Sequence, residues 1–237
     1  MQLSSFSKQF IRSSNLIPLL YTSQFCSHIN TLEHVYPRCF TDQNIHNRDI
    51  HNIFATTYTM NSLRSNFTFD ILDPKSQDVI NLDNTLISRN KKIIYPSISD
   101  RGVIARAVLY MQSTYNYSDF GNYSLYSEWN DKCKPRIKEC IHNEFAYVIQ
   151  GTRNPHIDKH YKNDKKYIET SIMIKKEILR LLENKDLKPC YTHWEKILDQ
   201  IFEEEKIQEE LRCPKCNKLY LRKSFYDKHV AKCIEQK

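Results

Sequence analysis

Residues Leu32-Glu33-His34-Val35-Tyr36-Pro37-Arg38 are the most informative about the fold of this chain of 237 residues. It is rich in residues that favour strands, and Pro37 cannot continue a strand ladder. The stretch therefore predicts a short strand around Leu32 to Tyr36. Two adjacent ionisable residues, Glu33 and His34, lie on that strand, and they are the first candidates for a reactive site.

The residues that follow predict a strand, strand, helix order. A second strand is expected at Asp49 to Phe54, and a short helix is expected from about Ala55 to Asn66. Alternation then resumes at Phe67, Phe69 and Ile71. Residues 70–96 contain Asp73-Pro74 and many Asn, Asp and Ser residues, so we expect a surface loop there.

The second half of the chain predicts helices. A core helix from Arg101 to about Tyr115 has Asp100 or Ser99 as its cap. Two further helices are expected, one containing Leu125 and Trp129 and one ending at Gln150 before Gly151. Residues 167–183 and 193–210 predict two charged amphipathic helices that form a connecting arm.

This order of elements indicates an α+β protein with four segments. They are an uncertain N-terminal segment at 1–30, a main domain at 31–161, a helical connector at 162–210 and a small C-terminal module at 211–237. Their net charges differ, since 1–161 carries +3, 162–210 carries −2 and 211–237 carries +6. The last segment therefore has the charge of a contact module for a polyanion. With only 3 glycines, a Walker-type or Rossmann enzyme is not expected.

The C-terminal module carries the spacing of a zinc site. Cys213 and Cys216 form CxxC, twelve residues separate Cys216 from His229, and three separate His229 from Cys233. Two thiolates from a tight turn and two ligands four apart on a helix complete a tetrahedral structural Zn²⁺ site with no open position. Basic residues around it favour phosphate contacts, and a protein partner is the alternative.

Compartment and membrane association also follow from composition. No apolar run approaches the length needed to span a bilayer, so a membrane protein is not expected. Five cysteines remain outside the zinc site, which does not suit a complete disulfide framework. Without a convincing signal peptide, we expect an intracellular setting, with a viral or organellar one as an alternative.

Five segments together resemble a known family. They are Leu32 to Arg38, Asp49-Ile50-His51-Asn52, Asn61-Ser62-Leu63-Arg64-Ser65-Asn66, Arg101-Gly102-Val103-Ile104-Ala105-Arg106 and Gln150-Gly151-Thr152-Arg153-Asn154-Pro155. In this order they resemble the endonuclease I family of nonspecific bacterial periplasmic and secreted nucleases. The resemblance covers roughly Leu32 to Asp158, and it implies a His-Me finger (ββα-metal) core with surrounding helices.

The resemblance implies roles for four residues. His34 would be the general base, and Glu33 and Asn61 would hold one magnesium ion, with manganese or calcium as alternatives. Arg64 would approach the phosphate or instead tie its helix to the body. The implied substrate is DNA, and RNA as a second substrate, cut with little regard to sequence to leave 5′-phosphates.

Other residues in the five segments are not expected to be catalytic. His51 is more simply explained as a structural histidine. The remaining polar positions would organise the metal helix or line the DNA cleft, and they are Arg106, Gln150, Arg153 and Asn154.

Elementary chemistry supports the roles of the pair and adds a geometric demand. Cutting a phosphodiester needs an activated water and a cation that neutralises the phosphate. A histidine with a pKa near 6.5 can accept the proton of water at neutral pH. Adjacent residues of a regular strand point to opposite faces, so Glu33 and His34 can share one cleft only if the chain bends there.

The alternative function is an inactive nuclease fold that binds nucleic acid and is targeted by the zinc finger.

Overall fold

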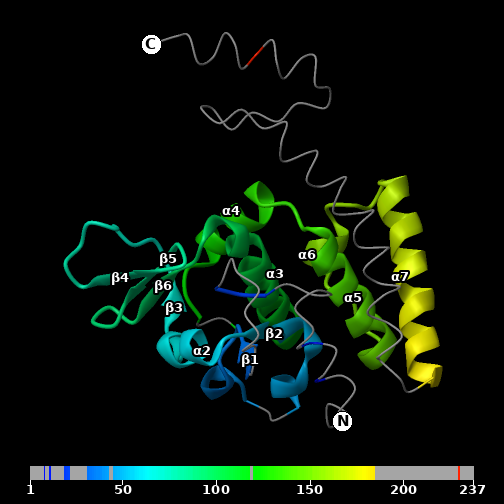
Figure 1. The fold of residues 1–237 in the computed structure, drawn as a ribbon, viewed down its shortest axis with the longest axis horizontal. Helices are drawn as coiled ribbons and strands as arrows, with labels where there is room; N and C mark the ends of the chain where they lie inside the picture. Colours follow the sequence, from blue (N-terminus) through cyan, green and yellow to red (C-terminus); the bar gives the residue numbers. More distant parts are fainter. Residues whose placement is uncertain are drawn as a thin grey trace. The chain divides into compact units, whose positions relative to one another are not determined.

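In the computed structural model, the described residues are 8, 11, 19–21, 31–42, 45–117, 120–184 and 229. The chain divides into two compact units, Met1–Lys185 and Asp186–Lys237. Every helix and strand named below belongs to the first unit (Figure 1). Helices and two small sheets make this unit a mixed α+β structure, which confirms the predicted class.

The predicted strand, strand, helix order is present. β1 (Thr31–His34) pairs antiparallel with β2 (Ile53–Thr56), and α2 (Tyr58–Arg64) follows directly. The Thr57 side chain caps α2 by accepting a hydrogen bond from the Met60 amide. Three 3-10 turns connect the strands, and they are η1 (Arg38–Phe40), η2 (His46–Arg48) and η3 (Ile50–Asn52).

The second strand begins later than the sequence predicted. The Asp49 side chain accepts a hydrogen bond from the His51 amide and caps η3. This local bond draws residues 50–52 into a 3-10 turn, so the strand occupies only Ile53–Thr56.

The prediction of a surface loop over residues 70–96 is wrong, because a second sheet forms there. Its strands lie in the order β3-β6-β5-β4. Asp83 and Asn84 both have positive φ, at 49° and 63°, and make the tight two-residue hairpin turn between β4 and β5. The turn residues that suggested a loop therefore close a hairpin. The strand bounds are β3 (Thr68–Phe69), β4 (Val79–Leu82), β5 (Thr85–Ser88) and β6 (Ile93–Tyr95).

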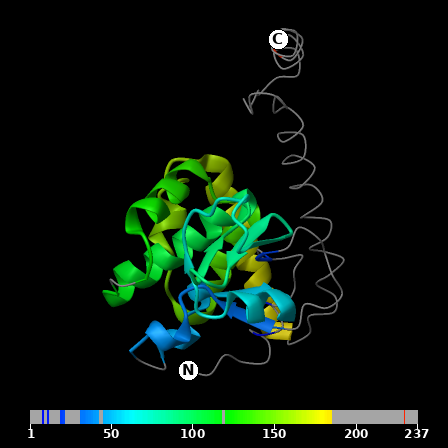
Figure 2. The same ribbon diagram turned by 90° about the vertical axis from the view of Figure 1, so that its left-hand side faces the viewer.

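The helix α3 (Ile98–Tyr115) forms the centre of the core. Its cap is Ser97 rather than the predicted Asp100 or Ser99. Residues 102–112 are all buried, as expected for a helix covered on every side. A Cβ at Gly102 would lie 2.7 Å from the Cys133 carbonyl oxygen, so glycine is needed for this close approach. In Figure 1, α3 lies between the second sheet on the left and α5 and α7 on the right, and Figure 2 views the same unit from the side of the sheet.

Four more helices follow among the described residues, and α4 (Tyr123–Lys132) packs on α3. α5 (Ile137–Gln150) ends at Gly151, whose φ of 82° fits the predicted stop. α6 (Pro155–Asp158) follows, and α7 (Lys165–Asn184) packs on α5. The first helix of the predicted connector is thus part of the first unit.

The expected helix at 193–210 and three of the four proposed zinc ligands, Cys213, Cys216 and Cys233, lie outside the described residues. His229 is described, in helical conformation. Within the described part of the chain, no helix is long and apolar enough to cross a membrane.

Candidate active site

Glu33 lies on β1 with its side chain only 1% exposed. Its Oε1 atom accepts a hydrogen bond from the Tyr21 hydroxyl at 3.1 Å and lies 3.0 Å from Nε of Arg64. Burial raises the pKa of Glu33, while Arg64 and the Tyr21 hydrogen bond oppose that rise. Tyr21 was not predicted as a site residue. The preceding residue, Leu20, donates its amide to the Ala55 carbonyl of β2, and no pattern in the N-terminal sequence indicates this contact.

Arg64 fastens the end of α2 to the end of β1. Its guanidinium donates to the backbone carbonyls of His34, Val35 and Ser65, and it lies 5.0 Å from the centroid of the Phe69 ring. The side chain is 1% exposed. These contacts are the ones expected of a tie between helix and body, and the role of Arg64 at the phosphate stays a prediction.

His34 is half-buried, and one of its ring nitrogens makes a hydrogen bond to the backbone. Nε2 lies 3.0 Å from the Asn47 carbonyl oxygen. A carbonyl oxygen can only accept, so Nε2 carries the proton and Nδ1 keeps the lone pair. Burial lowers the pKa of His34 below 6.5, although the bond to Asn47 opposes this. The lowered pKa favours the neutral ring, in which Nδ1 can accept a proton.

Asn61 lies on the same face of β1 as Glu33. Its amide nitrogen donates to Thr31 Oγ1 at 3.0 Å and to the Leu32 carbonyl at 3.1 Å. Thr31 and Glu33 are two apart on a regularly paired strand and so share one face. Among the residues that the structure describes, none bonds to the Asn61 amide oxygen, which makes it a candidate ligand atom beside the strand.

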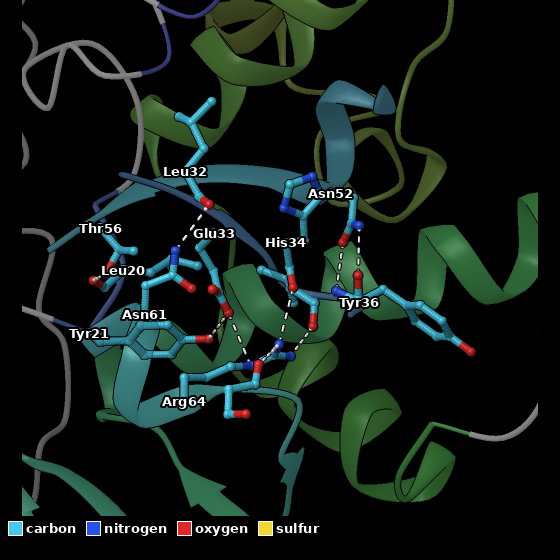
Figure 3. Close-up of polar contacts among 12 residues, drawn as sticks. Leu20, Tyr21, Leu32, Glu33, His34, Tyr36, Asn52, Thr56, Asn61 and Arg64 are labelled. Atoms are coloured by element: carbon cyan, nitrogen blue, oxygen red, sulfur yellow. Dashed lines mark hydrogen bonds and ion pairs between the residues drawn. The ribbon is translucent and has the colours of Figure 1, made fainter. Parts of the chain in front are cut away.

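The Glu33 and His34 side chains leave β1 on opposite sides. In Figure 3 the Glu33 carboxylate points toward Tyr21 and Arg64, whereas the His34 ring points away from them. The strand pairs regularly through His34↔Ile53, and the bend begins only at Val35. The structure thus differs from the expectation that a bend would bring both side chains into one cleft.

Asn52 explains why the bend comes after the pair. Its side chain accepts from the Tyr36 amide at 2.6 Å and donates to the Tyr36 carbonyl at 2.9 Å. These two bonds fix the backbone of Tyr36, three residues beyond Glu33.

Asp49 anchors the loop that orients His34. Its carboxylate accepts from the Tyr110 and Tyr115 hydroxyls at 3.0 and 2.6 Å and from Gln150 Nε2 at 2.9 Å, besides the His51 amide. Gln150 also accepts from the Ile50 amide. The segment at Asp49 and the segment at Gln150, about a hundred residues apart, therefore meet in space. The tyrosines could not be found from the sequence, because no local pattern links them to Asp49.

The remaining polar positions of the five segments also make structural contacts. Arg106 binds Glu139 through two nitrogens at 2.7 and 2.8 Å, and Asn154 donates to the Arg106 carbonyl. Arg153 pairs with Glu144 and Asp158. His51 is buried, and its Nε2 lies 3.1 Å from the Thr152 carbonyl. These contacts hold α3, α5 and α6 together.

No group of three or more His, Cys, Asp or Glu side chains that could hold a metal ion occurs among the residues that the structure describes. A cation at Glu33 and Asn61 would have only one carboxylate and one amide as protein ligands.

Comparison with known proteins identifies the family. The family model for endonuclease I matches residues 7–161, which is well over half of the chain. The chain belongs to the endonuclease I family. The match begins within the N-terminal segment, which agrees with the contact that Tyr21 makes to Glu33.

Several endonuclease I relatives are moderately similar. An extracellular deoxyribonuclease of Aeromonas hydrophila is 30% identical over 112 residues, covering 47% of this chain and 49% of that protein. Endonuclease-1 of Buchnera aphidicola (from Acyrthosiphon pisum) is 32% identical over 114 residues, covering 47% and 45%. A periplasmic deoxyribonuclease of Aeromonas hydrophila is 28% identical over 112 residues, covering 47% of each. The chain thus spans about half the length of these relatives.

The expected intracellular location is contradicted by these relatives. Two of them are named as extracellular or periplasmic proteins. The expectation rested on cysteine use and on the composition of the N-terminal segment, and neither outweighs the location of related endonucleases.

Proposed function

We propose that this chain is a secreted endonuclease that hydrolyses phosphodiester bonds of DNA, and of RNA as a second substrate, with one divalent cation. The observation that carries the proposal is the endonuclease I match over residues 7–161, which includes Glu33, His34 and Asn61. The relatives named as deoxyribonucleases favour an active enzyme over an inactive binding protein. Contacts to phosphate rather than to base edges would make cutting largely independent of sequence.

His34 is proposed as the general base. Its Nε2–H donates to the Asn47 carbonyl, which fixes the ring and leaves Nδ1 to take a proton from water. The lowered pKa keeps the ring in its proton-accepting form at neutral pH. The Asn47 carbonyl acts as a positioning group, because it touches only the histidine.

Glu33 and Asn61 are proposed as the cation ligands, and their donor atoms fit a hard cation. Mg²⁺ prefers carboxylate and amide oxygens and keeps several waters, so two protein ligands are sufficient. Both contacts of Glu33 among the described residues use Oε1, which leaves Oε2 for a cation. When bound, the cation would neutralise charge on the phosphate. The element order β1, β2, α2 that carries these residues is proposed to be the ββα-metal finger.

The opposite placement of Glu33 and His34 adds a requirement to this proposal. His34 is the last residue of β1. A phosphate bound at this end of the strand would therefore lie next to the face of Glu33 and the face of His34. Substrate binding would have to bring Glu33 Oε2 and His34 Nδ1 toward that end together. Loosening of the contact between Glu33 and Arg64 would permit this movement.

The C-terminal module is proposed to be a structural zinc finger that binds nucleic acid. The proposal rests on the spacing of Cys213, Cys216, His229 and Cys233 and on the basic charge of residues 211–237. The alternative is a finger that contacts a protein and so directs the nuclease to its target.

The proposed function is tested by incubating supercoiled plasmid with the purified chain, with Mg²⁺ or with a chelator. We expect nicking that requires Mg²⁺, and a loss of roughly 10–100-fold in Asn61→Ala, since a ligand is removed. Asn66→Ala is the matched control, because Asn66 is exposed and, within the described part of the chain, its side chain bonds only Cys39 Sγ. Equal nicking in chelator, or no nicking by the wild-type chain, would refute the proposal.

A further inference from the structure

A second candidate binding site lies on helices remote in sequence from β1 and α2. A cavity of about 330 Å³ opens between α5, the segment around α6 and α7. Its lining includes Tyr147, Arg153, Tyr161, Lys162, Tyr167 and Lys175. We call this site the α7 groove. α7 begins at Lys165, beyond the residues matched by the family model, so this groove is built partly from what this chain adds to the matched region.

Aromatic and apolar side chains form walls of the α7 groove. The Tyr161 and Tyr167 rings stack with centroids 4.1 Å apart and planes 8° apart. Ile168 and Ile172 are 47% and 50% exposed, and Tyr147 is 37% exposed. A stacked pair of rings beside open apolar surface offers a planar ligand a place to continue the stack. The cavity volume is in the range that encloses a small organic group.

The charges of the α7 groove favour an anion. Arg153 pairs with both carboxylates in the lining, at 2.6 Å from Glu144 and 2.8 Å from Asp158. Lys162 and Lys175 therefore have no carboxylate partner among the described residues. The Lys175 ammonium lies 4.8 Å from the centroid of the Tyr147 ring, which holds it at the groove by a cation–π contact. With three basic and two acidic side chains, the lining carries a net charge of +1, and Lys162 and Lys175 are the cations that remain for an anion.

We propose that the α7 groove binds single-stranded nucleic acid, with phosphates on Lys162 and Lys175 and a base stacked against the tyrosines. A basic groove with aromatic side chains is the arrangement by which proteins hold unpaired strands without reading sequence. A peptide needs neither phosphate-binding lysines nor a ring stack, so it fits less well. The choice of ligand rests on the proposed function, but the groove shares no residue with Glu33, His34 or Asn61. It would hold a strand apart from the site of cutting.

The lysine contribution is tested by fluorescence anisotropy with a labelled short oligothymidylate and the full chain in chelator, so that no cutting occurs. We expect the double variant Lys162→Ala/Lys175→Ala to bind about tenfold more weakly. We also expect the slope of the logarithm of the binding constant against the logarithm of salt concentration to become shallower by about 1.4. This is roughly 0.7 for each phosphate that a lysine no longer neutralises. The control Lys165→Ala/Lys176→Ala removes the same charge from two exposed lysines outside the groove lining, and it should change affinity less than twofold.

The aromatic contribution is tested with Tyr167→Leu against Tyr167→Phe. Loss of the ring should weaken oligothymidylate binding by about fivefold or more, whereas Tyr167→Phe keeps the ring and should bind normally. Inorganic polyphosphate should bind Tyr167→Leu and wild type equally, because it has no bases. Unchanged binding in the lysine double variant or in Tyr167→Leu would overturn the proposal.

Plasmid nicking measured on the same preparations separates the two proposals. If the wild-type chain fails to nick plasmid but shows these differences in binding, the nuclease proposal fails and the α7 groove stands. If it nicks plasmid but shows none of them, the groove proposal fails alone.

Discussion

At the scale of single residues, the buried ion pair of Glu33 and Arg64 dominates the candidate site. The Arg64 and Glu33 side chains are 2% and 1% exposed, so both charges are shielded from bulk solvent. Arg64 compensates the carboxylate and also bonds three backbone carbonyls at the junction of β1 and α2. Breaking such a pair leaves an uncompensated charge in the interior.

We predict that Arg64→Met lowers the free energy of unfolding by about 3–5 kcal/mol. Adding Glu33→Gln to Arg64→Met should restore part of this stability, because the unpaired carboxylate is gone. Urea unfolding measures both effects. Arg101→Met is the control, since Arg101 is half-buried and stacks on Tyr95, and a destabilisation as large as that of Arg64→Met would show that the buried pair has no special role.

The lowered pKa of His34 gives a pH prediction. A general base works only when deprotonated, so kcat/KM should rise with pH as His34 loses its proton and then level off. Because burial lowers this pKa, the midpoint of the rise should lie below 6.5. The pH profile of plasmid nicking under substrate-limited conditions measures it. A midpoint above 6.5 would contradict the neutral, buried state of the ring.

The sequence predicted which residue types would gather near β1, but not how they contact one another. Glu33 and Arg64 were recognised from the family segments, whereas Tyr21 and its hydroxyl contact were not. Strand alternation indicated opposite faces for Glu33 and His34, but the expected bend at the pair did not occur, so the prediction of one shared cleft was wrong. The position of the bend could not be foreseen, because it depends on Asn52 bonding to Tyr36 across the loop.

At the scale of elements, the loop between β1 and β2 is held by bonds to α3 and α5. Asp49 joins η3 to Tyr110 and Tyr115 on α3 and to Gln150 on α5. The same loop presents the Asn47 carbonyl to His34. The helices of the core therefore position the proposed base indirectly.

We predict that Asp49→Ala destabilises the protein by at least about 2 kcal/mol, because several buried donors lose their acceptor. Asp73→Ala, at an exposed loop position, should change stability by less than about 0.5 kcal/mol. Thermal and urea unfolding test both. An Asp49→Ala chain as stable as the control would show that the Asp49 contacts do not anchor the loop.

The elements themselves differed in how well the sequence predicted them. α3, α5 and α7 were foreseen because apolar periodicity and Gly151 mark them. β4 and β5 were missed because Asp83-Asn84 was interpreted as part of a loop, although positive φ at both residues builds a hairpin. The second strand begins later than predicted because the Asp49 cap draws residues 50–52 into a 3-10 turn.

At the scale of the whole molecule, the two units raise separate questions. The first unit holds the proposed site and the α7 groove, and the second carries the motif with zinc-ligand spacing. The cysteine spacing predicts a zinc site, which stays a prediction, whereas cysteine use misled about location. Thiolate ligands describe a metal site and do not by themselves define a compartment.

We predict one Zn²⁺ per chain, measured by elemental analysis after dialysis. Cys213→Ser should lose most of the metal, because one of four ligands is removed. Cys39→Ser is the control, since Cys39 is an exposed free cysteine outside the motif. Full zinc occupancy in Cys213→Ser would refute the module as described.

The role of His34 in activating water is measured by single-turnover nicking of supercoiled plasmid with His34→Ala. We expect a rate at least about 100-fold below wild type, because a general base is lost. His160→Ala, whose ring bonds Asn130, should retain the wild-type rate. Nicking by His34→Ala within about twofold of wild type would show that His34 is not the base.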